Sequence, residues 1–239
     1  MNSSRTREAA ILGAFVCVGL VVLGYLISST AIRVKGMDRI VTVKGLAERE
    51  VEANIAIWPI KFNEANNELT QLYSVIEKKS DLIVKFLKNN GFADEEITIS
   101  QPAIVDKQAQ NYGDASKIQF RYTASTTITV YSDKVSLVRE TMKKVVELVK
   151  EGIALSGQDY QNKTEFIFTE LNKIKPEMIE EATQNGREVA TKFAIDSKSK
   201  LGKIKKASQG QFSINDRDTS TQYIKKVRVV STIEYYLSD

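Results

Sequence analysis

The 239-residue sequence contains no histidine, a single cysteine and three prolines, and these scarcities exclude most familiar enzyme chemistries. Without histidine there is no imidazole acid–base catalyst, no Ser–His or Cys–His nucleophile pair and no histidine-ligated metal. Cys17 alone forms no intramolecular disulfide, CxxC motif or thiolate zinc site. The twelve glycines include no GxGxxG and no phosphate-binding loop. We therefore expect no catalytic residues, no metal and no organic cofactor.

Charges are nearly balanced along most of the chain. There are 34 Lys and Arg against 30 Asp and Glu, a net charge of +4, and residues 1–37 contribute +3 of it. A nucleic-acid-binding protein would concentrate basic residues on one face. We therefore expect no nucleic-acid partner.

The longest uncharged run lies near the N-terminus. Twenty-four residues separate Glu8 from Arg33, and residues 9–27 are almost wholly apolar. About 20 such residues cross a membrane as a helix, whereas the apolar region of a cleaved signal peptide has roughly 7–15. We predict a cytoplasmic tail at 1–8 and a transmembrane signal-anchor helix at 9–31. The body then faces the periplasm from the inner membrane. Cleavage after residues 28–31, leaving a soluble periplasmic protein, is the alternative.

The body alternates two hydrophobic periodicities, which predicts an α+β fold with three main helices. Helices are expected at about 64–90, 133–152 and 176–202, with Asp133 and Pro176 marking the starts of the last two. Strands are expected at 40–46, 51–62, 97–105, 118–130, 166–171, 204–214 and 223–237.

Three local features carry structural expectations. Pro59 cannot donate to a β-ladder, so it indicates an edge strand or a bulge. Trp58, the single tryptophan, is expected to pack in a core or an interface. Small residues along the third helix would let it approach a neighbour closely: Ala182, Gly186, Ala190 and Ala194.

Four segments resemble a known family in their order and spacing. They are Val41–Gly45 with Glu48–Ile57; Leu87, Gly91-Phe92 and Glu96–Thr98; Tyr112, Tyr122–Ala124 and Thr126–Val130; and Ala182, Ala190, Phe193, Ala194 and Leu201-Gly202. Together they resemble the SIMPL domain family of exported bacterial proteins over about residues 38–238. Ala53-Asn54 stands where the family often has Pro-Asp, which departs from its typical subfamily.

The resemblance implies a two-part architecture for the exported body, residues 38–239. Two intertwined α/β-sandwich subdomains with long antiparallel strands are expected, one at about 38–112 plus 220–239 and the other at about 115–215. The resemblance also implies export and homo-oligomerisation, and no established catalytic activity.

Candidate sites are few, and each has an ordinary structural interpretation. Glu48, Glu50 and Glu52 are possible paired carboxylates, but alternating charges beside a hairpin are usually solvated. Residues 215–219, with two aspartates, have the oxygen-rich composition of a cation loop but lack the glycine and distal glutamate of an EF-hand. Asn162-Lys163-Thr164 is a formal glycosylation sequon.

Three classes of function remain. The first is a membrane-tethered, non-catalytic envelope protein that self-assembles in a structural or scaffolding role. It accounts for the apolar run, the long strand at 118–130 and the missing catalytic residues, so we rank it first. The second is an envelope binding module for a protein partner or small ligand, and the third is a hydrolase using carboxylates alone.

Overall fold

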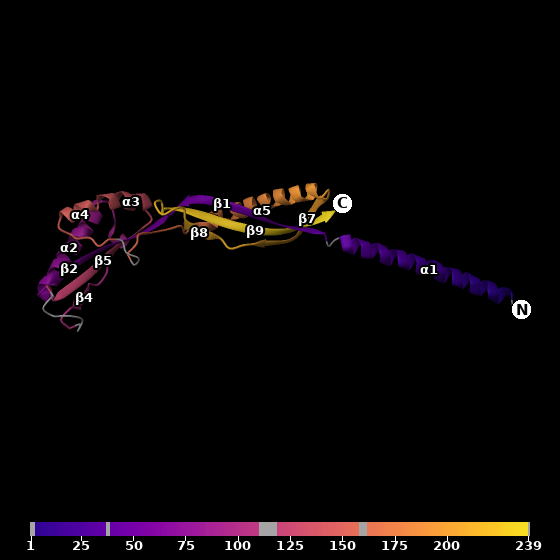
Figure 1. The fold of residues 1–239 in the computed structure, drawn as a ribbon, viewed down its shortest axis with the longest axis horizontal. Helices are drawn as coiled ribbons and strands as arrows, with labels where there is room; N and C mark the ends of the chain where they lie inside the picture. Colours follow the sequence, from indigo (N-terminus) through magenta and orange to yellow (C-terminus); the bar gives the residue numbers. More distant parts are fainter. Residues whose placement is uncertain (1–2, 37–38, 110–118, 158–161, 239) are drawn as a thin grey trace. The chain divides into compact units, whose positions relative to one another are not determined.

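The computed structural model describes residues 3–36, 39–109, 119–157 and 162–238. An N-terminal helix, α1 (Ser3–Gly36), precedes an α+β body with two antiparallel sheets and four helices (Figure 1), which confirms the predicted class. The contacts divide the chain into unit 1 (residues 1–49, 175–213 and 228–239) and unit 2 (50–174 and 214–227). The subdomain bounds expected from the family resemblance stay a prediction.

Helix α1 contains the predicted apolar segment. Residues Leu12–Thr30 have a mean hydropathy of 2.2 and none of them is buried. The hydroxyls of Ser29 and Thr30 donate to the Leu26 carbonyl oxygen at 2.9 and 2.8 Å, so the helix satisfies them internally. Among the described residues this is the one helix long and apolar enough to span a membrane, and a signal sequence has the same properties.

The first sheet has the order β1-β9-β7, and β8 also pairs with β9. Its strands are β1 (Ile40–Glu52), β7 (Lys200–Gln209), β8 (Ser213–Asp216) and β9 (Ile224–Ser238). Within unit 1, α5 (Leu171–Asp196) buries one residue per turn: Met178, Ala182, Gly186, Ala190 and Ala194. The expected close approach is present, because a Cβ on Gly45 would lie 1.8 Å from the Ala182 carbonyl oxygen.

The second sheet, in unit 2, has the order β3-β5-β2-β6, and β4 also pairs with β5. Its strands are β2 (Ile55–Asn66), β3 (Ile97–Ile99), β4 (Ala103–Asp106), β5 (Tyr122–Ser132) and β6 (Glu165–Ile167). Its core face packs against α2 (Leu69–Asn89), α3 (Val135–Lys144) and α4 (Val146–Lys150). Trp58 lies in this core, 4% exposed, as predicted.

Two predicted helix boundaries in unit 2 are wrong. Residues 64–66 belong to β2, because β2 pairs with β5 as far as Asn66. The helix expected at 133–152 is two helices, since the Val145 amide donates to Met142 at 3.4 Å and the helix is interrupted there. The first of the two begins at Val135 with Lys134 as its N-cap and no side-chain cap, so Asp133 does not cap it, and the Ser132 hydroxyl accepts from the Lys134 amide at 3.0 Å.

The third helix is displaced from its predicted position. It begins at Leu171, so Pro176 lies inside it instead of at its first turn. It ends at Asp196, where Lys198 adopts a φ of 54° and the Ser199 amide donates back to Ala194 at 2.8 Å. This early end lets β7 start at Lys200, and the strand expected at 204–214 is divided between β7 and β8.

Pro59 occupies an internal strand rather than an edge strand. On one side it pairs with Thr129 of β5. On the other side, among the described residues, β6 reaches only Ile57 and the next bridge joins Phe62 to Leu155. On this second side Pro59 therefore has no ladder partner among the described residues that would need its missing amide. The strand expected to begin at Ile118 begins at Tyr122 in the structure. Ile118 itself, and Tyr112 of the family resemblance, lie outside the described residues.

Candidate functional site

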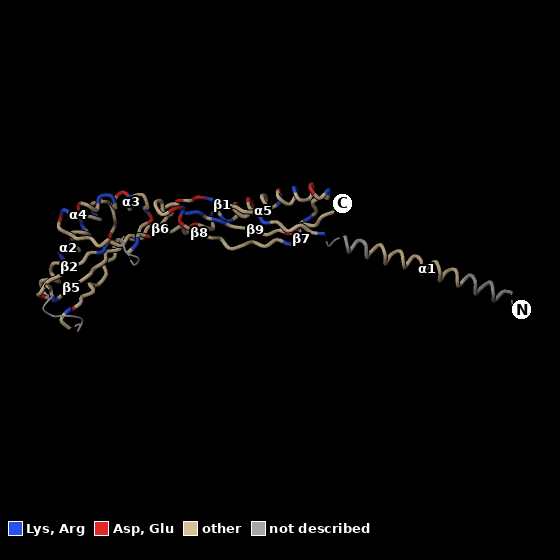
Figure 2. The backbone as a smooth tube through the Cα atoms, in the orientation of Figure 1, with Lys and Arg blue, Asp and Glu red and all other residues tan. Residues whose placement is uncertain are grey.

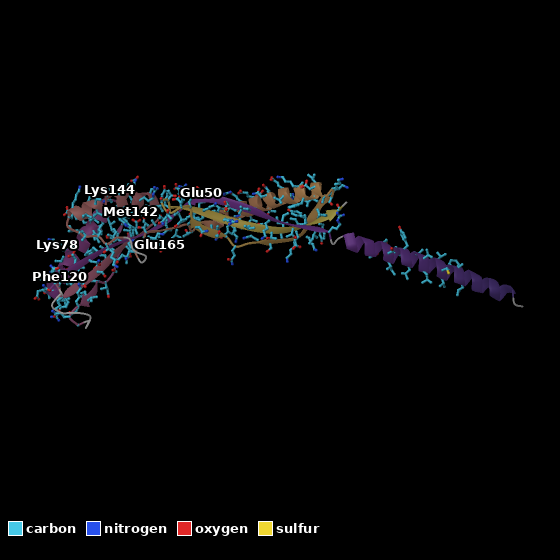
Figure 3. The ribbon with its side chains drawn as sticks, viewed as in Figure 1. Glu50, Lys78, Phe120, Met142, Lys144 and Glu165 are labelled. Carbon is cyan, nitrogen blue, oxygen red and sulfur yellow. The ribbon has the colours of Figure 1, made fainter. Side chains whose placement is uncertain are left out.

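Two of the three candidate carboxylates on β1, those of Glu48 and Glu50, form ion pairs with arginines of the same chain. Glu48 lies 3.4 Å from the Nε atom of Arg228, and Glu50 accepts from Arg217 at 3.3 Å. Glu50 is labelled in Figure 3. Glu52 is exposed on the same strand. Carboxylates held by arginines act as acceptors in ion pairs, which suits a surface network better than acid–base catalysis.

The oxygen-rich turn at 215–219 is closed by its own hydrogen bonds. The Asp218 carboxylate accepts from the amides of Ser220 and Thr221 at 2.8 and 2.7 Å and from the Thr221 hydroxyl. It also accepts from Arg217 Nε at 3.1 Å. The Thr221 hydroxyl and then the Arg217 guanidinium hold the pKa of Asp218 well below its usual range.

The second aspartate of the turn is likewise engaged. The Asp216 carboxylate accepts a hydrogen bond from the ammonium group of Lys225, which is only 9% exposed. Among the described residues no three His, Cys, Asp or Glu side chains lie close enough together to hold a metal ion. The geometry of the turn is therefore that of a structural connection. In the sequon, Asn162 and Thr164 are both buried, so the acceptor amide is poorly accessible.

A hollow of about 630 Å³ opens at the end of β2 and β5, where Glu64 is opposite Ala124. Lys79 of α2 forms an ion pair with Glu64 there, and its Nζ atom also donates to the Gly152 carbonyl oxygen at 2.9 Å. Phe120 (Figure 3), the methyl-bearing side chains of β4 and the hydroxyls of β5 line the remainder.

The charged groups that line this hollow are engaged with each other. Among the described lining residues the one carboxylate, Glu64, is paired with the one ammonium group, Lys79, whereas glycoside hydrolysis needs two carboxylates flanking a bond. The hydroxyls of Thr123 and Ser125 have no imidazole to activate them, since the chain has no histidine. Sequence reasoning missed the Glu64–Lys79 pair because it placed Glu64 in the helix.

A second surface of interest is the sheet face of unit 2 that points away from the helices. Even-numbered residues are buried from 56 to 62 in β2 and from 124 to 132 in β5, so odd-numbered ones occupy this outer face. Ile57 lies opposite Tyr131 and Ile55 opposite Ile167. Tyr131 is 55% exposed and Ile167 is 37% exposed. We call the apolar residues Ile55, Ile57, Tyr131 and Ile167 the outer patch.

The outer patch continues into a polar, Thr-rich surface on β5. Thr123, Ser125, Thr127 and Thr129 share the face. Both edges of β5 are paired, because β2 pairs along one side and β3 and β4 along the other.

Comparison with known proteins identifies one family. The family described as SIMPL, protein of unknown function (DUF541), matches residues 41–232. That range contains α2 to α5 and β2 to β8, nearly all of β1 and the first part of β9. A search of curated proteins found no match.

Proposed function

The chain belongs to the SIMPL family, and from that premise we propose that it is a membrane-tethered, non-catalytic protein of the bacterial cell envelope. Its body, in two intertwined α/β-sandwich subdomains, faces the periplasm and self-associates in a structural or scaffolding role. A signal peptide cleaved to leave a soluble periplasmic body is the alternative location. No metal, cofactor or nucleic acid takes part.

The observation that carries this proposal is the outer patch. Exposed or half-buried apolar side chains gathered on one sheet face favour a protein contact, because burying them removes apolar area from water. The same face carries one basic and one acidic residue of the two strands beside the patch, Lys61 and Glu165. A second copy meets this face without net repulsion, and a shared membrane raises the effective concentration of the copies.

The absence of catalysis is supported by how the acidic residues are used. Glu48, Glu50, Asp216 and Asp218 each hold a basic side chain of the same chain, and Glu64 holds Lys79. A carboxylate-only hydrolase would need a pair of acids facing a shared substrate. That hydrolase is the least favoured of the three functions.

The proposal is tested by the mass of the full-length chain in detergent micelles at micromolar concentration. We expect analytical ultracentrifugation to give a protein mass of two or more times the 26.8 kDa of one chain. Tyr131→Lys in the outer patch should shift the chain to monomer. Tyr73→Lys on α2 is the matched control, because Tyr73 is 54% exposed and lies away from the patch. A wild-type monomer, or equal effects of both substitutions, would overturn the proposal.

The hollow at Glu64 supports the alternative of a small-ligand binding module. Its volume is large enough for a drug-sized molecule, and one ion pair offers both an acceptor and a donor. A monomeric wild-type chain whose Lys79→Met variant loses a ligand found by mass spectrometry of the native protein would favour this function.

A further inference from the structure

We propose that the C-terminal end of α5 and the β7 strand bind anionic lipid headgroups of the membrane to which the chain is tethered. We call this surface the basic tip and define it by Lys192, Phe193, Ile195, Lys198, Lys203, Ile204, Lys205 and Lys206. The inference rests on the tether of the proposed function, and it is independent of self-association.

The near neutrality of the whole chain conceals a strong local charge at the basic tip. Residues 192–206 contain six lysines and one aspartate, a net charge of +5. Because residues 1–37 carry +3 and the chain +4, all other residues together carry −4. Figure 2 shows basic positions on α5 and β7 at this end of unit 1. A phospholipid surface with negative headgroups is the complementary partner.

The lysines of the basic tip are available to a partner. Within the part of the chain that the structure describes, Lys192, Lys198, Lys203 and Lys206 are exposed and form no ion pair. Lys205 is also exposed, and its Nζ atom lies 5.8 Å from the ring centroid of Tyr236.

Exposed apolar side chains accompany these lysines. Phe193 is 56%, Ile195 68% and Ile204 42% exposed. Lysines on an edge strand such as β7 commonly prevent unwanted pairing, and lysines at a helix C-terminus favour its dipole. Neither effect explains an exposed phenylalanine and two isoleucines among them. Basic residues with apolar side chains that enter the headgroup region are typical of surfaces that lie on membranes.

The basic tip is at the end of unit 1 from which the tether leaves. The Arg39 guanidinium donates to the Ser199 hydroxyl at 3.1 Å, and the Leu237 amide donates to the Arg39 carbonyl oxygen at 2.8 Å. The start of β1 is therefore joined directly to the turn between α5 and β7, and Figure 1 shows these ends together.

The tether is also short. Only nine residues separate Thr30, the end of the apolar segment, from Ile40. Since α1 continues to Gly36, the chain spans at most roughly 25 Å over these residues. A membrane anchored through α1 is thus within reach of the basic tip.

The test uses the full-length chain, one copy per nanodisc, in discs of phosphatidylcholine alone or with about one quarter phosphatidylglycerol. A membrane-impermeant amine reagent and mass spectrometry measure the labelling rate of each lysine. We expect rates at Lys192, Lys198 and Lys206 to fall about fivefold or more in the anionic discs and to recover in about 0.5 M NaCl. Lys78 and Lys85 on α2 should label equally in both (Figure 3 marks Lys78).

Two variants separate lipid binding from other causes of protection. Replacing Lys203, Lys205 and Lys206 together by Gln should abolish most of the lipid-dependent protection of Lys192 and Lys198. The matched control, Lys78→Gln with Lys85→Gln and Lys143→Gln, removes the same charge from exposed positions and should retain it.

Labelling that is equal in the two lipids overturns the proposal. Protection of these lysines that requires a second copy of the chain in the disc also overturns it. The same holds if an added single-stranded oligonucleotide protects them more strongly than phosphatidylglycerol does. If the N-terminal segment is cleaved, the chain will not remain in the disc, which is a failure of the proposed function. The mature chain is then tested by sedimentation with vesicles of the same lipids, and equal pelleting with both overturns the lipid proposal separately.

Discussion

At the scale of single residues, Gly45 permits the contact between α5 and β1. A Cβ there would lie 1.8 Å from the Ala182 carbonyl oxygen and 2.6 Å from the Gly186 nitrogen, both main-chain atoms that cannot rotate away. We predict that Gly45→Ala destabilises the folded chain by about 3 kcal/mol or more. Urea unfolding followed by circular dichroism measures this. Gly157→Ala is the control and should change stability little, because among the described residues no non-neighbouring atom lies within 4 Å of the added Cβ.

Asp218 gives a pH-dependent prediction at the same scale. Its pKa is lower in the folded chain than in the unfolded chain, because the Thr221 hydroxyl and the Arg217 guanidinium stabilise the carboxylate. This stabilisation is complete above the unfolded pKa of about 3.9 and is lost as the pH falls below it. Asp218→Asn should therefore lower the Tm by a few degrees near neutral pH.

The difference in Tm between wild type and Asp218→Asn should shrink as the pH falls below about 4. Scanning calorimetry at several pH values measures it. Asp133→Asn, at an exposed aspartate that caps no helix, should have no comparable effect at any pH. A constant difference between wild type and Asp218→Asn would show that the carboxylate charge is not what stabilises the turn.

Some of these residue contacts were foreseeable and others were not. The small residues of α5 are regularly spaced, so the sequence predicted a close neighbour. It did not identify Gly45 as that neighbour, because 136 residues separate it from Ala182 and no local pattern links them. The same applies to Glu50 and Arg217, whose pairing depends on the strand topology.

At the scale of elements, periodicity predicted the interiors of helices and strands better than their ends. The last strand, expected at 223–237, lies at Ile224–Ser238, where six alternating buried positions between residues 225 and 235 fix its inward face. Helix ends depend on one or two backbone groups instead. Lys198 ends α5 in the left-handed conformation that glycine usually adopts, and the sequence offers no signal for this at a lysine.

Lys198 therefore provides a prediction for the stability of α5. With φ at 54°, its Cβ is crowded by the backbone, and Lys198→Gly should raise the free energy of unfolding by up to about 1 kcal/mol. Lys192→Gly, inside the helix, should lower it by about 1 kcal/mol. Thermal unfolding monitored by circular dichroism distinguishes these opposite signs. A loss of stability in both variants would mean that the end of α5 is not constrained as described.

At the scale of the whole molecule, composition and order were sufficient to identify the fold class and the family. An apolar N-terminal segment, an α+β body and family motifs in their expected order were all readable from the sequence. The division into units was not, because β1 and β9 each continue from one unit into the other. The basic tip was missed for a related reason, since net charge averages over surfaces that only the folded chain separates.

The fate of the N-terminal segment is the prediction on which the tethered molecule depends. Twenty-four consecutive uncharged residues exceed what a cleaved signal peptide needs, so we expect the segment to be retained. Mass spectrometry of protein purified from membranes should find peptides that contain Arg5 and Arg7. Leu20→Arg, at the centre of the apolar segment, should reduce the membrane-bound fraction. Leu12→Arg, at its end, should reduce it less because the side chain reaches the headgroups. A mature N-terminus near Ile32 would contradict the anchor, and both substitutions would then affect export alone.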